Sequence, residues 1–254
     1  MGLCRRDFLR WGLMGLAAGG MVTRSVYPIY GTEEEEPKRG LEYNPEDHYY
    51  GYLIDTYKCI GCGMCVQACK MENSVPEKFF RTWVERYLIA DNGEDLVVDS
   101  PHGGISGFQP EVTKFNITKG FFVPKMCNHC QNTPCIQVCP VGASYMTEDG
   151  LVLVDFKHCI GCGYCVQACP YGSRFMNPYT HTADKCTWCY HRISRYMLPA
   201  CVQACPVKAR RFGDLKDPND EVRRIIATER VGVLQPDLLT KPKCFYLGLD
   251  KEVV

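Results

Sequence analysis

The chain has 254 residues, 46% of them hydrophobic and 23% charged, and its 29 lysines and arginines equal its 29 aspartates and glutamates. This composition is typical of a soluble globular protein and excludes a polytopic membrane protein or a disordered tail. The formal charge of zero argues against nucleic-acid binding, which favours a basic excess. Cysteine is unusually frequent, with 18 residues. A chain of this length does not need disulfides to fold, so the cysteines are expected to bind something.

Residues 1–27 resemble a twin-arginine export signal. Arg5 and Arg6 precede Phe-Leu-Arg and an apolar run over 11–22, which is the order typical of such signals. The run is shorter than the ~20 residues that span a bilayer, and no small-x-small cleavage site stands out after it. The segment is therefore predicted to be a signal or an uncleaved N-terminal tether, with a short amphipathic or buried helix as the alternative. Residues 28–48 contain the charged run TEEEEPKRG and are predicted to be a solvated linker.

The first cysteine group reads CIGCGMCVQAC over 59–69. Its spacing, C-x2-C-x2-C-x3-C, is the bacterial ferredoxin run for iron–sulfur ligation. Gly61 and Gly63 permit the positive φ that lets the backbone curl around a cluster, and the third cysteine is expected to open a short helix. In the other groups a proline follows the fourth cysteine and stops this helix. Lys70 stands there instead, so the first helix is free to run on through 71–73.

A long insertion follows the first group over 70–125. Strand-like stretches are predicted at Trp83–Ala90, Leu96–Asp99 and Val112–Ile117. A segment of this kind serves either as partner surface or as scaffold. The same two possibilities hold for the C-terminal arm, residues 217–254.

Residues 127–169 hold the second and third groups. The third group reads CIGCGYCVQAC over 159–169 and nearly repeats the first, and the endings CIQVC and CVQAC recur in groups two and four. These repeats indicate internal duplication. The stretch 141–158 reads as two strands around a tight turn at Asp149–Gly150. This segment is therefore predicted to be a complete two-cluster ferredoxin unit.

The first and fourth groups provide the matching halves of a second unit. The residues after group four (206–213) echo those after group two, and YGYLIDTYK at 50–58 echoes the residues before group three. If these stretches pair as strands, the segments 49–126 and 170–216 form an outer unit into which 127–169 is inserted. The predicted fold is α+β, with two ferredoxin-like two-cluster units, one inserted in the other, and short helices and β-hairpins around the clusters.

Sixteen cysteines in four groups of four are the candidate ligands. In a two-cluster ferredoxin the fourth cysteine of a run ligates the other cluster. Each of four predicted [4Fe–4S] clusters therefore takes three cysteines from one group and one from the paired group. The predicted sets are Cys59, Cys62, Cys65 and Cys205; Cys127, Cys130, Cys135 and Cys169; Cys159, Cys162, Cys165 and Cys139; and Cys186, Cys189, Cys201 and Cys69.

Zinc sites and disulfides are the alternatives to iron–sulfur clusters. Zinc sites usually show paired C-x2-C halves on either side of a spacer, and disulfides would be strained at these close spacings. Three cysteines in seven residues followed by a fourth fit neither pattern, so the spacing favours clusters.

Other residues near the ligands have weaker predictions. Cys4 belongs to the signal, and Cys244 is predicted to be a small buried side chain. His129 lies inside C-N-H-C, where four cysteines already satisfy the group, so it is predicted to support a ligand or to lie on the surface. Trp188 is predicted to shield a cluster from water. Five lysines beside ligands either raise cluster potentials or are ordinary solvated residues: Lys58, Lys70, Lys125, Lys157 and Lys185.

The sixteen cysteines, with CKMENSVP after group one, RTWVER at 81–86 and KCTWCYHR at 185–192, resemble a known family over residues 50–213. It comprises the four-cluster iron–sulfur subunits of the complex iron–sulfur molybdoenzymes. Members serve dimethyl sulfoxide, polysulfide, thiosulfate, tetrathionate and arsenate reductases, the NrfC type associated with nitrite reductase, and complexes such as menaquinone reductase. The cluster pairing in that family is the one given above.

The resemblance implies a non-catalytic subunit that relays electrons through four [4Fe–4S] clusters. Its partners would be an integral membrane quinone-interacting subunit of the polysulfide-reductase type and a molybdopterin-type catalytic subunit or a multihaem cytochrome c. The complex would lie on the periplasmic face of the cytoplasmic membrane. No G-x-S-x-G, H-E-x-x-H or phosphate-binding loop competes as a catalytic motif. The alternatives are a beta subunit of an exported formate dehydrogenase or hydrogenase and, from other classes, a stand-alone enzyme or a structural metal-binding protein.

Overall fold

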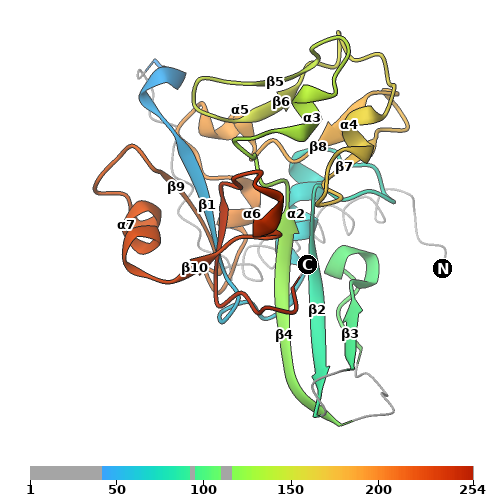
Figure 1. Cartoon of the computed structure of the whole chain (residues 1–254), viewed down its shortest axis with the longest axis vertical. Helices are drawn as coiled ribbons and strands as arrows, with labels where there is room; N and C mark the ends of the chain where they lie inside the picture. The colour runs from blue at the N-terminus through green and yellow to red at the C-terminus, as the bar shows by residue number, and fades with distance from the viewer. Residues whose placement is uncertain (1–41, 92–94, 110–115, 254) are drawn as a thin grey trace, which may run out of the picture. The chain divides into compact units, whose positions relative to one another are not determined.

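The computed structural model describes residues 42–91, 95–109 and 116–253 (Figure 1). The predicted export signal, Cys4 and most of the predicted linker lie outside these residues. A short 3-10 helix, η1 (Pro45–Asp47), precedes the first strand. Among the described residues, no helix has the length and apolar character needed to cross a membrane.

A four-stranded sheet holds the first strand in its interior. β1 (Tyr50–Asp55) is buried at all six positions, which explains why its sequence YGYLID does not alternate between apolar and polar residues. It runs antiparallel to β9, with Tyr52 opposite Phe212. This is the pairing that the sequence predicts for the stretches flanking groups one and four. The strands in spatial order are β10 (Val231–Gly232), β11 (Cys244–Leu247), β1 (Tyr50–Asp55) and β9 (Arg210–Asp214).

The C-terminal arm supplies part of this sheet. β11 lies parallel to β1, with Cys244 opposite Tyr52, and the Cys244 side chain is fully buried, as predicted. A helix, α7 (Glu221–Thr228), contacts β9 and β1. Its first turn is capped by the Asp220 carboxylate, which accepts hydrogen bonds from two backbone N–H groups. A further 3-10 turn is η3 (Pro236–Leu238). This stretch of the arm is therefore scaffold.

The insertion after group one forms a separate three-stranded sheet of spatial order β3-β2-β4. The strands β2 (Thr82–Ala90) and β3 (Leu96–Asp99) lie where the sequence predicts them. β4 spans Ile117–Met126, whereas the third predicted strand, Val112–Ile117, lies mostly outside the described residues and shares only Ile117 with it. Pro124 obscured this strand, but β4 pairs only with β2 and so lies at the sheet edge, where proline is tolerated.

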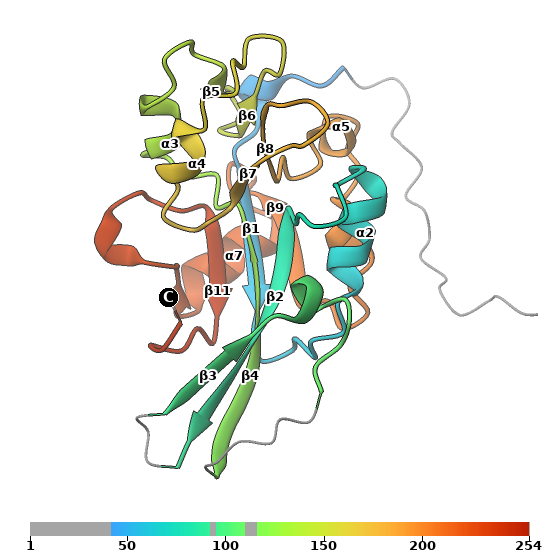
Figure 2. The same ribbon diagram turned by 90° about the vertical axis from the view of Figure 1, so that its right-hand side faces the viewer.

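Two β-hairpins lie with the short helices α3 (Pro134–Gln137) and α4 (Tyr164–Gln167) (Figure 2). The predicted hairpin between groups two and three is present: β5 (Ser144–Met146) pairs antiparallel with β6 (Val152–Val154), and the turn includes the predicted Gly150 with positive φ. A second hairpin pairs β7 (Arg174–Met176) with β8 (Ala183–Lys185). The sequence predicts β-hairpins around the clusters but gives no position for this one.

Short helices carry the third cysteine of each group, and α2 is the one among them that also includes the fourth, Cys69. The first helix runs on past Lys70 as predicted, whereas the helices followed by proline end within about one turn. The insertion adds a 3-10 turn at its sheet. The elements are α2 (Met64–Glu72), α3 (Pro134–Gln137), α4 (Tyr164–Gln167), α5 (Tyr190–Ile193), α6 (Ala200–Gln203) and η2 (Pro101–Gly104).

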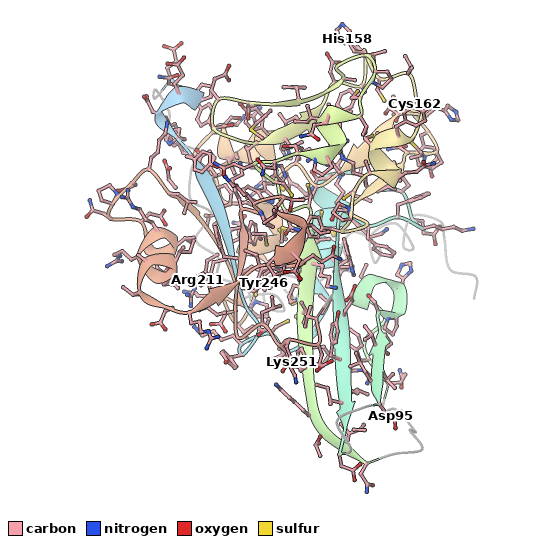
Figure 3. All side chains as sticks on the ribbon, viewed as in Figure 1. Asp95, His158, Cys162, Arg211, Tyr246 and Lys251 are labelled. Atoms are coloured by element: carbon pink, nitrogen blue, oxygen red, sulfur yellow. The ribbon has the colours of Figure 1, made fainter. Side chains whose placement is uncertain are left out.

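The buried core and the cysteine groups are one structure. Tyr52, Trp188 and Tyr246 are almost completely inaccessible and belong to a cluster of buried side chains that also contains thiols from groups one, two and four. Tyr246 lies on β11 in the interior of the sheet (Figure 3). Residues that hold the fold together therefore also surround the candidate ligands.

Candidate metal-cluster sites

One cavity is lined by Cys59, Cys62, Cys65 and Cys205. The first three come from the loop that leads into α2, where Gly61 and Gly63 have the expected positive φ. Cys205 comes from the end of the α6 segment, far along the sequence from the other three. The structure thus brings together the first predicted ligand set from two distant parts of the described chain.

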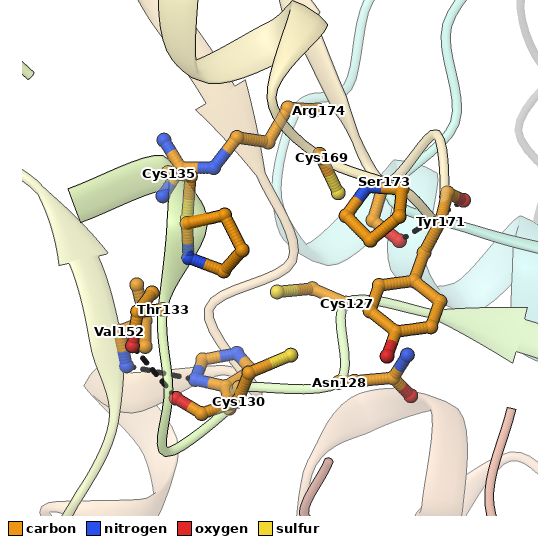
Figure 4. A pocket seen from close by; sticks show the side chains of 13 residues that line it. Cys127, Asn128, Cys130, Thr133, Cys135, Val152, Cys169, Tyr171, Ser173 and Arg174 are labelled. Atoms are coloured by element: carbon orange, nitrogen blue, oxygen red, sulfur yellow. Dashed lines mark hydrogen bonds between the residues drawn. The ribbon is translucent and has the colours of Figure 1, made fainter. Parts of the chain in front are cut away.

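A second cavity is lined by Cys127, Cys130, Cys135 and Cys169. Figure 4 shows these thiols around one space, with Cys127 and Cys169 on one side and Cys130 on another. The loop of Cys130 is fixed by the Thr133 hydroxyl, which donates to the Cys130 carbonyl at 2.8 Å. This is the second predicted ligand set.

The predicted set of Cys186, Cys189, Cys201 and Cys69 gathers at the contact between α2 and α6. The Asn73 side-chain amide lies 3.6 Å from the sulfur of Cys69 and 3.7 Å from that of Cys189. Burial raises the pKa of Cys69, and the charges of Cys186, Cys201 and Cys189 raise it further, which places all four thiols in one neighbourhood. This is the predicted set of Cys69 with group four.

The predicted set of Cys159, Cys162, Cys165 and Cys139 lies around α3 and α4, which pack against each other. Cys165 is buried and Cys162 is exposed at the periphery (Figure 3). Cys139 is only partly buried. Burial would raise its pKa, but N–H groups of 141–144 hold it below its usual value. The pairing of Cys139 with the third group stays a prediction.

Backbone N–H groups point at several of these sulfurs. The N–H of Ala209 lies 3.3 Å from Cys205, that of Ala183 lies 3.4 Å from Cys159, and that of Trp188 lies 3.4 Å from Cys186. Hydrogen bonds to cysteine sulfur are one of the means by which proteins set cluster potentials.

The free thiols in the interior resist ionisation. Burial raises the pKa of Cys65, Cys135 and Cys189 to about 11 and that of Cys130 to about 12. A metal ligand must be a thiolate, so metal binding has to release these protons and compensate for the burial of negative charge. The sites are suited to a cation-rich group and poorly suited to bare thiolates.

The alternatives of disulfides and single-ion sites can be compared with this geometry. Every cysteine in the described ranges is a free thiol. In the same ranges, no three His, Cys, Asp or Glu side chains converge as the ligands of one ion do. The thiols of two predicted sets line the walls of cavities.

Unpaired buried polar atoms support the fit of a charged group. The side-chain amide of Asn128 has no partner and lines the cavity of Cys127. Arg210 lines the cavity of Cys59 and has two unpaired nitrogens. Buried polar atoms without a hydrogen-bond partner indicate that an ion or a water molecule binds beside them. A [4Fe–4S] cluster bound at these thiols would supply one-electron redox chemistry.

His129 and Trp188 join group two to group four. His129 is fully buried, so the alternative of a surface position was wrong. Its Nδ1 accepts from the Val152 N–H at 2.9 Å, and its Nε2 therefore donates to the Cys186 carbonyl at 3.0 Å. Trp188 packs against this ring in a tilted arrangement, and its indole N–H donates to the Cys127 carbonyl. Both residues exclude water from the space between the two groups.

The five lysines beside ligands differ in environment. Lys58 and Lys157 are exposed, as the ordinary interpretation expects. Lys185 is buried and donates to the Cys186 carbonyl at 2.7 Å. Lys70 donates to three backbone carbonyls, and Lys125 forms an ion pair with a glutamate. Four further residues beside the thiols were not anticipated from the sequence: Asn73, Asn128, Arg174 and Arg210. Arg174 and Arg210 occupy equivalent positions in the repeat.

Comparison with known proteins gives a consistent result. Residues 58–143 and 118–215 each match a family described as a 4Fe-4S dicluster domain. The chain is 44% identical to a tetrathionate reductase subunit of Salmonella typhimurium over 209 residues, covering 82% of this chain and 75% of that protein. It is 46% identical to a tetrathionate reductase subunit of Archaeoglobus fulgidus, covering 79% and 82%. It is 38% identical to a polysulfide reductase chain of Wolinella succinogenes, covering 77% and 92%.

Proposed function

The chain is a member of the family of iron–sulfur electron-transfer subunits of reductase complexes and carries four [4Fe–4S] clusters, and from this premise we propose that it is a non-catalytic relay. Electrons would pass between an integral membrane subunit that handles quinone and a molybdopterin-type catalytic subunit or a multihaem cytochrome. Two of the relatives are tetrathionate reductase subunits, which favours a complex that reduces a sulfur compound.

The proposed order of the clusters follows from contacts between their ligand sets. The set with Cys162 adjoins the set with Cys135, because Cys135 and Cys165 lie in one buried cluster. The set with Cys135 also contains Cys127 and adjoins the set with Cys186. Burial and the charges of Cys201 and Cys189 raise the pKa of Cys186, and the charge of Cys127 raises it further. The last step runs from the set of group four to the set with Cys62. Burial raises the pKa of Cys65, which belongs to the latter set, and the charge of Cys201 from group four also raises it.

The ends of this series reach the surface, and this is the observation that carries the proposal. Cys62 and Cys162 are the exposed members of their groups, whereas all four thiols of the set with Cys186 are buried. A relay needs shielded clusters in the middle and accessible ones at its ends, because each end must exchange electrons with another protein.

Apolar side chains surround both exposed ends. Tyr57 and Ile60 are 83% and 57% exposed beside Cys62, and Phe156 and Ile160 are 67% and 64% exposed before Cys162. Exposed apolar side chains mark a protein–protein contact where they form one contiguous patch. We therefore assign one partner to each end of the series.

The inserted arrangement of two ferredoxin units is part of the same proposal. The antiparallel pairing of β1 with β9 supports it, because these strands flank groups one and four and close around the segment that separates them. The hairpin β5–β6 plays the corresponding role for groups two and three.

The proposed location is the periplasmic face of the cytoplasmic membrane. Its support is the twin-arginine pattern at Arg5 and Arg6. Replacing both arginines by lysine should leave the folded, cluster-loaded chain in the cytoplasmic fraction, which cell fractionation would detect. Export of this variant at the normal level would contradict the location.

A pull-down from solubilised membranes tests the relay. The tagged chain should copurify with one integral membrane subunit and one subunit that carries molybdopterin or several haems. Ile60→Asp and Ile160→Asp should each lose a different one of these partners while retaining full iron content. Val98→Asp is the matched control, since Val98 is exposed on β3 away from the cysteine groups. Copurification with neither class of partner would contradict the proposal.

A further inference from the structure

Two buried arginines occupy equivalent positions in the internal repeat. Arg174 follows Cys169 in the sequence CPYGSR, and Arg210 follows Cys205 in the sequence CPVKAR. Each is the fifth residue after its cysteine, and each begins a strand, β7 or β9. The repeat has thus produced one such arginine for each predicted ferredoxin unit.

Both side chains are buried without a countercharge. Arg174 is 4% exposed and Arg210 is 2% exposed. Among the described residues their side-chain partners are hydroxyl groups: Arg174 donates to Ser144 at 2.9 Å, and Arg210 donates to Thr82 at 2.8 Å. Neither takes part in an ion pair with a carboxylate of the described chain, unlike the neighbouring Arg211, which lies near Asp55 and Glu221. Burying an unpaired cation is costly, so each site needs a negative group nearby.

The remaining guanidinium nitrogens lie among the cysteine sulfurs. Arg174 has one unpaired buried nitrogen and Arg210 has two. Arg174 lines the cavity of Cys127 and Cys135 (Figure 4). Burial would lower its pKa, but the charges of Cys135, Cys127 and Cys165 raise it, and Cys165 is a member of the neighbouring set.

Arg210 lies between two sets in the corresponding way. It lines the cavity of Cys59, Cys62, Cys65 and Cys205. Burial would lower its pKa, but the charges of Cys65, Tyr52 and Cys201 raise it. The Tyr52 hydroxyl lies 3.2 Å from the sulfur of Cys201, which belongs to the set of group four. Each arginine therefore faces two ligand sets of one unit.

We propose that Arg174 and Arg210 are paired electrostatic tuning residues, each lying between the two clusters of one ferredoxin unit and raising the reduction potentials of both. A reduced cluster carries one more negative charge than an oxidised one. A fixed cation at short range in a low-dielectric interior stabilises the reduced state more strongly. The unpaired N–H groups would donate to cluster or cysteine sulfur and so strengthen the effect. The two arginines would keep neighbouring potentials high together, which favours hopping within each unit.

The test is a potentiometric titration, followed by EPR, of the full chain purified anaerobically with its clusters. Arg210→Gln should lower two of the four midpoint potentials and leave the other two unchanged. Arg174→Gln should lower the complementary two. At a fixed potential, the ratio of reduced to oxidised cluster should fall about tenfold, which is about 59 mV for one electron. Arg211→Gln is the matched control, because this residue is adjacent in β9 and ion-paired to carboxylates; it should move none of the four.

Several results would overturn the proposal. These are unchanged midpoints in glutamine variants with full iron content, a fall of equal size in Arg211→Gln, or a fall in one or in all four midpoints. If a glutamine variant loses iron, Arg→Lys at the same position keeps the charge. Midpoint potentials of the lysine variant close to the original would then support electrostatic tuning. A fall as large as that expected for glutamine, or a loss of iron in the lysine variant too, would overturn the proposal for that site.

The inference rests on the cluster ligand sets of the proposed function but not on its partners. Failure of the pull-down would leave the midpoints of the isolated chain unaffected. Conversely, midpoints that do not respond to Arg174 or Arg210 would leave the partner contacts intact. The two failures are therefore distinguishable.

Discussion

The two ferredoxin runs at 59–69 and 159–169 differ at one position, methionine or tyrosine, yet their surroundings differ greatly. The first run continues into a helix of nine residues, whereas the helix of the second has four. Cys69 at the end of the first run is buried, and Cys169 at the end of the second is only partly so. The shared motif sets the local backbone, with positive φ at both pairs of glycines, but the residues around it set burial and helix length.

The residue after each run explains the difference in helix length. Pro170 follows the second run and cannot continue a helix, because it lacks an N–H and clashes with the preceding turn. Lys70 follows the first run and adds a second effect, since its ammonium donates to the carbonyls of Pro76, Glu77 and Phe79. One residue thus extends α2 and ties it to the loop that leads into the insertion.

The largest expected effect comes from exchanging these two residues. Lys70→Pro should lower the free energy of unfolding by about 3 kcal/mol or more, because it breaks α2 in its interior. For a protein of this size that is a fall in Tm of roughly 6–12 °C, measurable by thermal unfolding with iron content. Pro170→Lys should change Tm by no more than a few degrees, since α4 has already ended. Equal effects of the two exchanges would contradict the explanation.

A smaller effect should separate the second glycine of each run. A Cβ at Gly63 would overlap the carbonyl oxygen of Gly104, whereas a Cβ at Gly163 would meet open space. Both alanine variants bear the strain of a positive φ, so the overlap at Gly104 makes the difference between them. Gly63→Ala should lower the free energy of unfolding by about 1–3 kcal/mol more than Gly163→Ala, the usual range for overpacking. Iron retained per chain after mild heating measures this difference. Similar retention in the two variants would show that the insertion does not press on the first run.

The smallest effect concerns the end of α2, which has no counterpart in the second run. Burial would raise the pKa of Glu72, but its hydrogen bond with His191 and the charge of Arg192 lower it below its usual value. The stabilisation is therefore present above the unfolded pKa, near 4.5, and is lost as pH falls through the folded value. It should amount to about 1 kcal/mol or less.

Glu72→Gln tests this dependence. The fall in urea midpoint between pH 6.5 and pH 4 should be smaller in the variant than in the original protein, because the variant has no carboxylate to protonate. An identical fall would exclude Glu72 as a source of acid sensitivity.

Local chemistry made much of the fold predictable. The glycine conformations, the extension of the first helix past Lys70 and the turn at Gly150 follow from residues that act on their own neighbours. The pairing of β1 with β9 was predictable because the repeat places equivalent strands around equivalent cysteines. The position of β4 was not, because Pro124 imitates a loop when its sheet edge is unknown.

Long-range contacts account for the other differences. The parallel pairing of β11 with β1 joins residues about 190 positions apart, and no sequence signal announces such a pairing. His129 is buried because group four closes over it, which the sequence C-N-H-C does not reveal. Arg174 and Arg210 have a signal in the repeat, but their burial without a countercharge becomes visible only in three dimensions.

The central claim is that four sets of cysteines hold four [4Fe–4S] clusters in one electron-transfer series. Iron and sulfide analysis with a reductive EPR titration of the anaerobically purified full chain tests it most directly. We expect four irons and four sulfides for each cysteine set, with four one-electron steps and magnetic interaction between neighbouring clusters. A colourless protein, or one that contains zinc in place of iron, would contradict the claim.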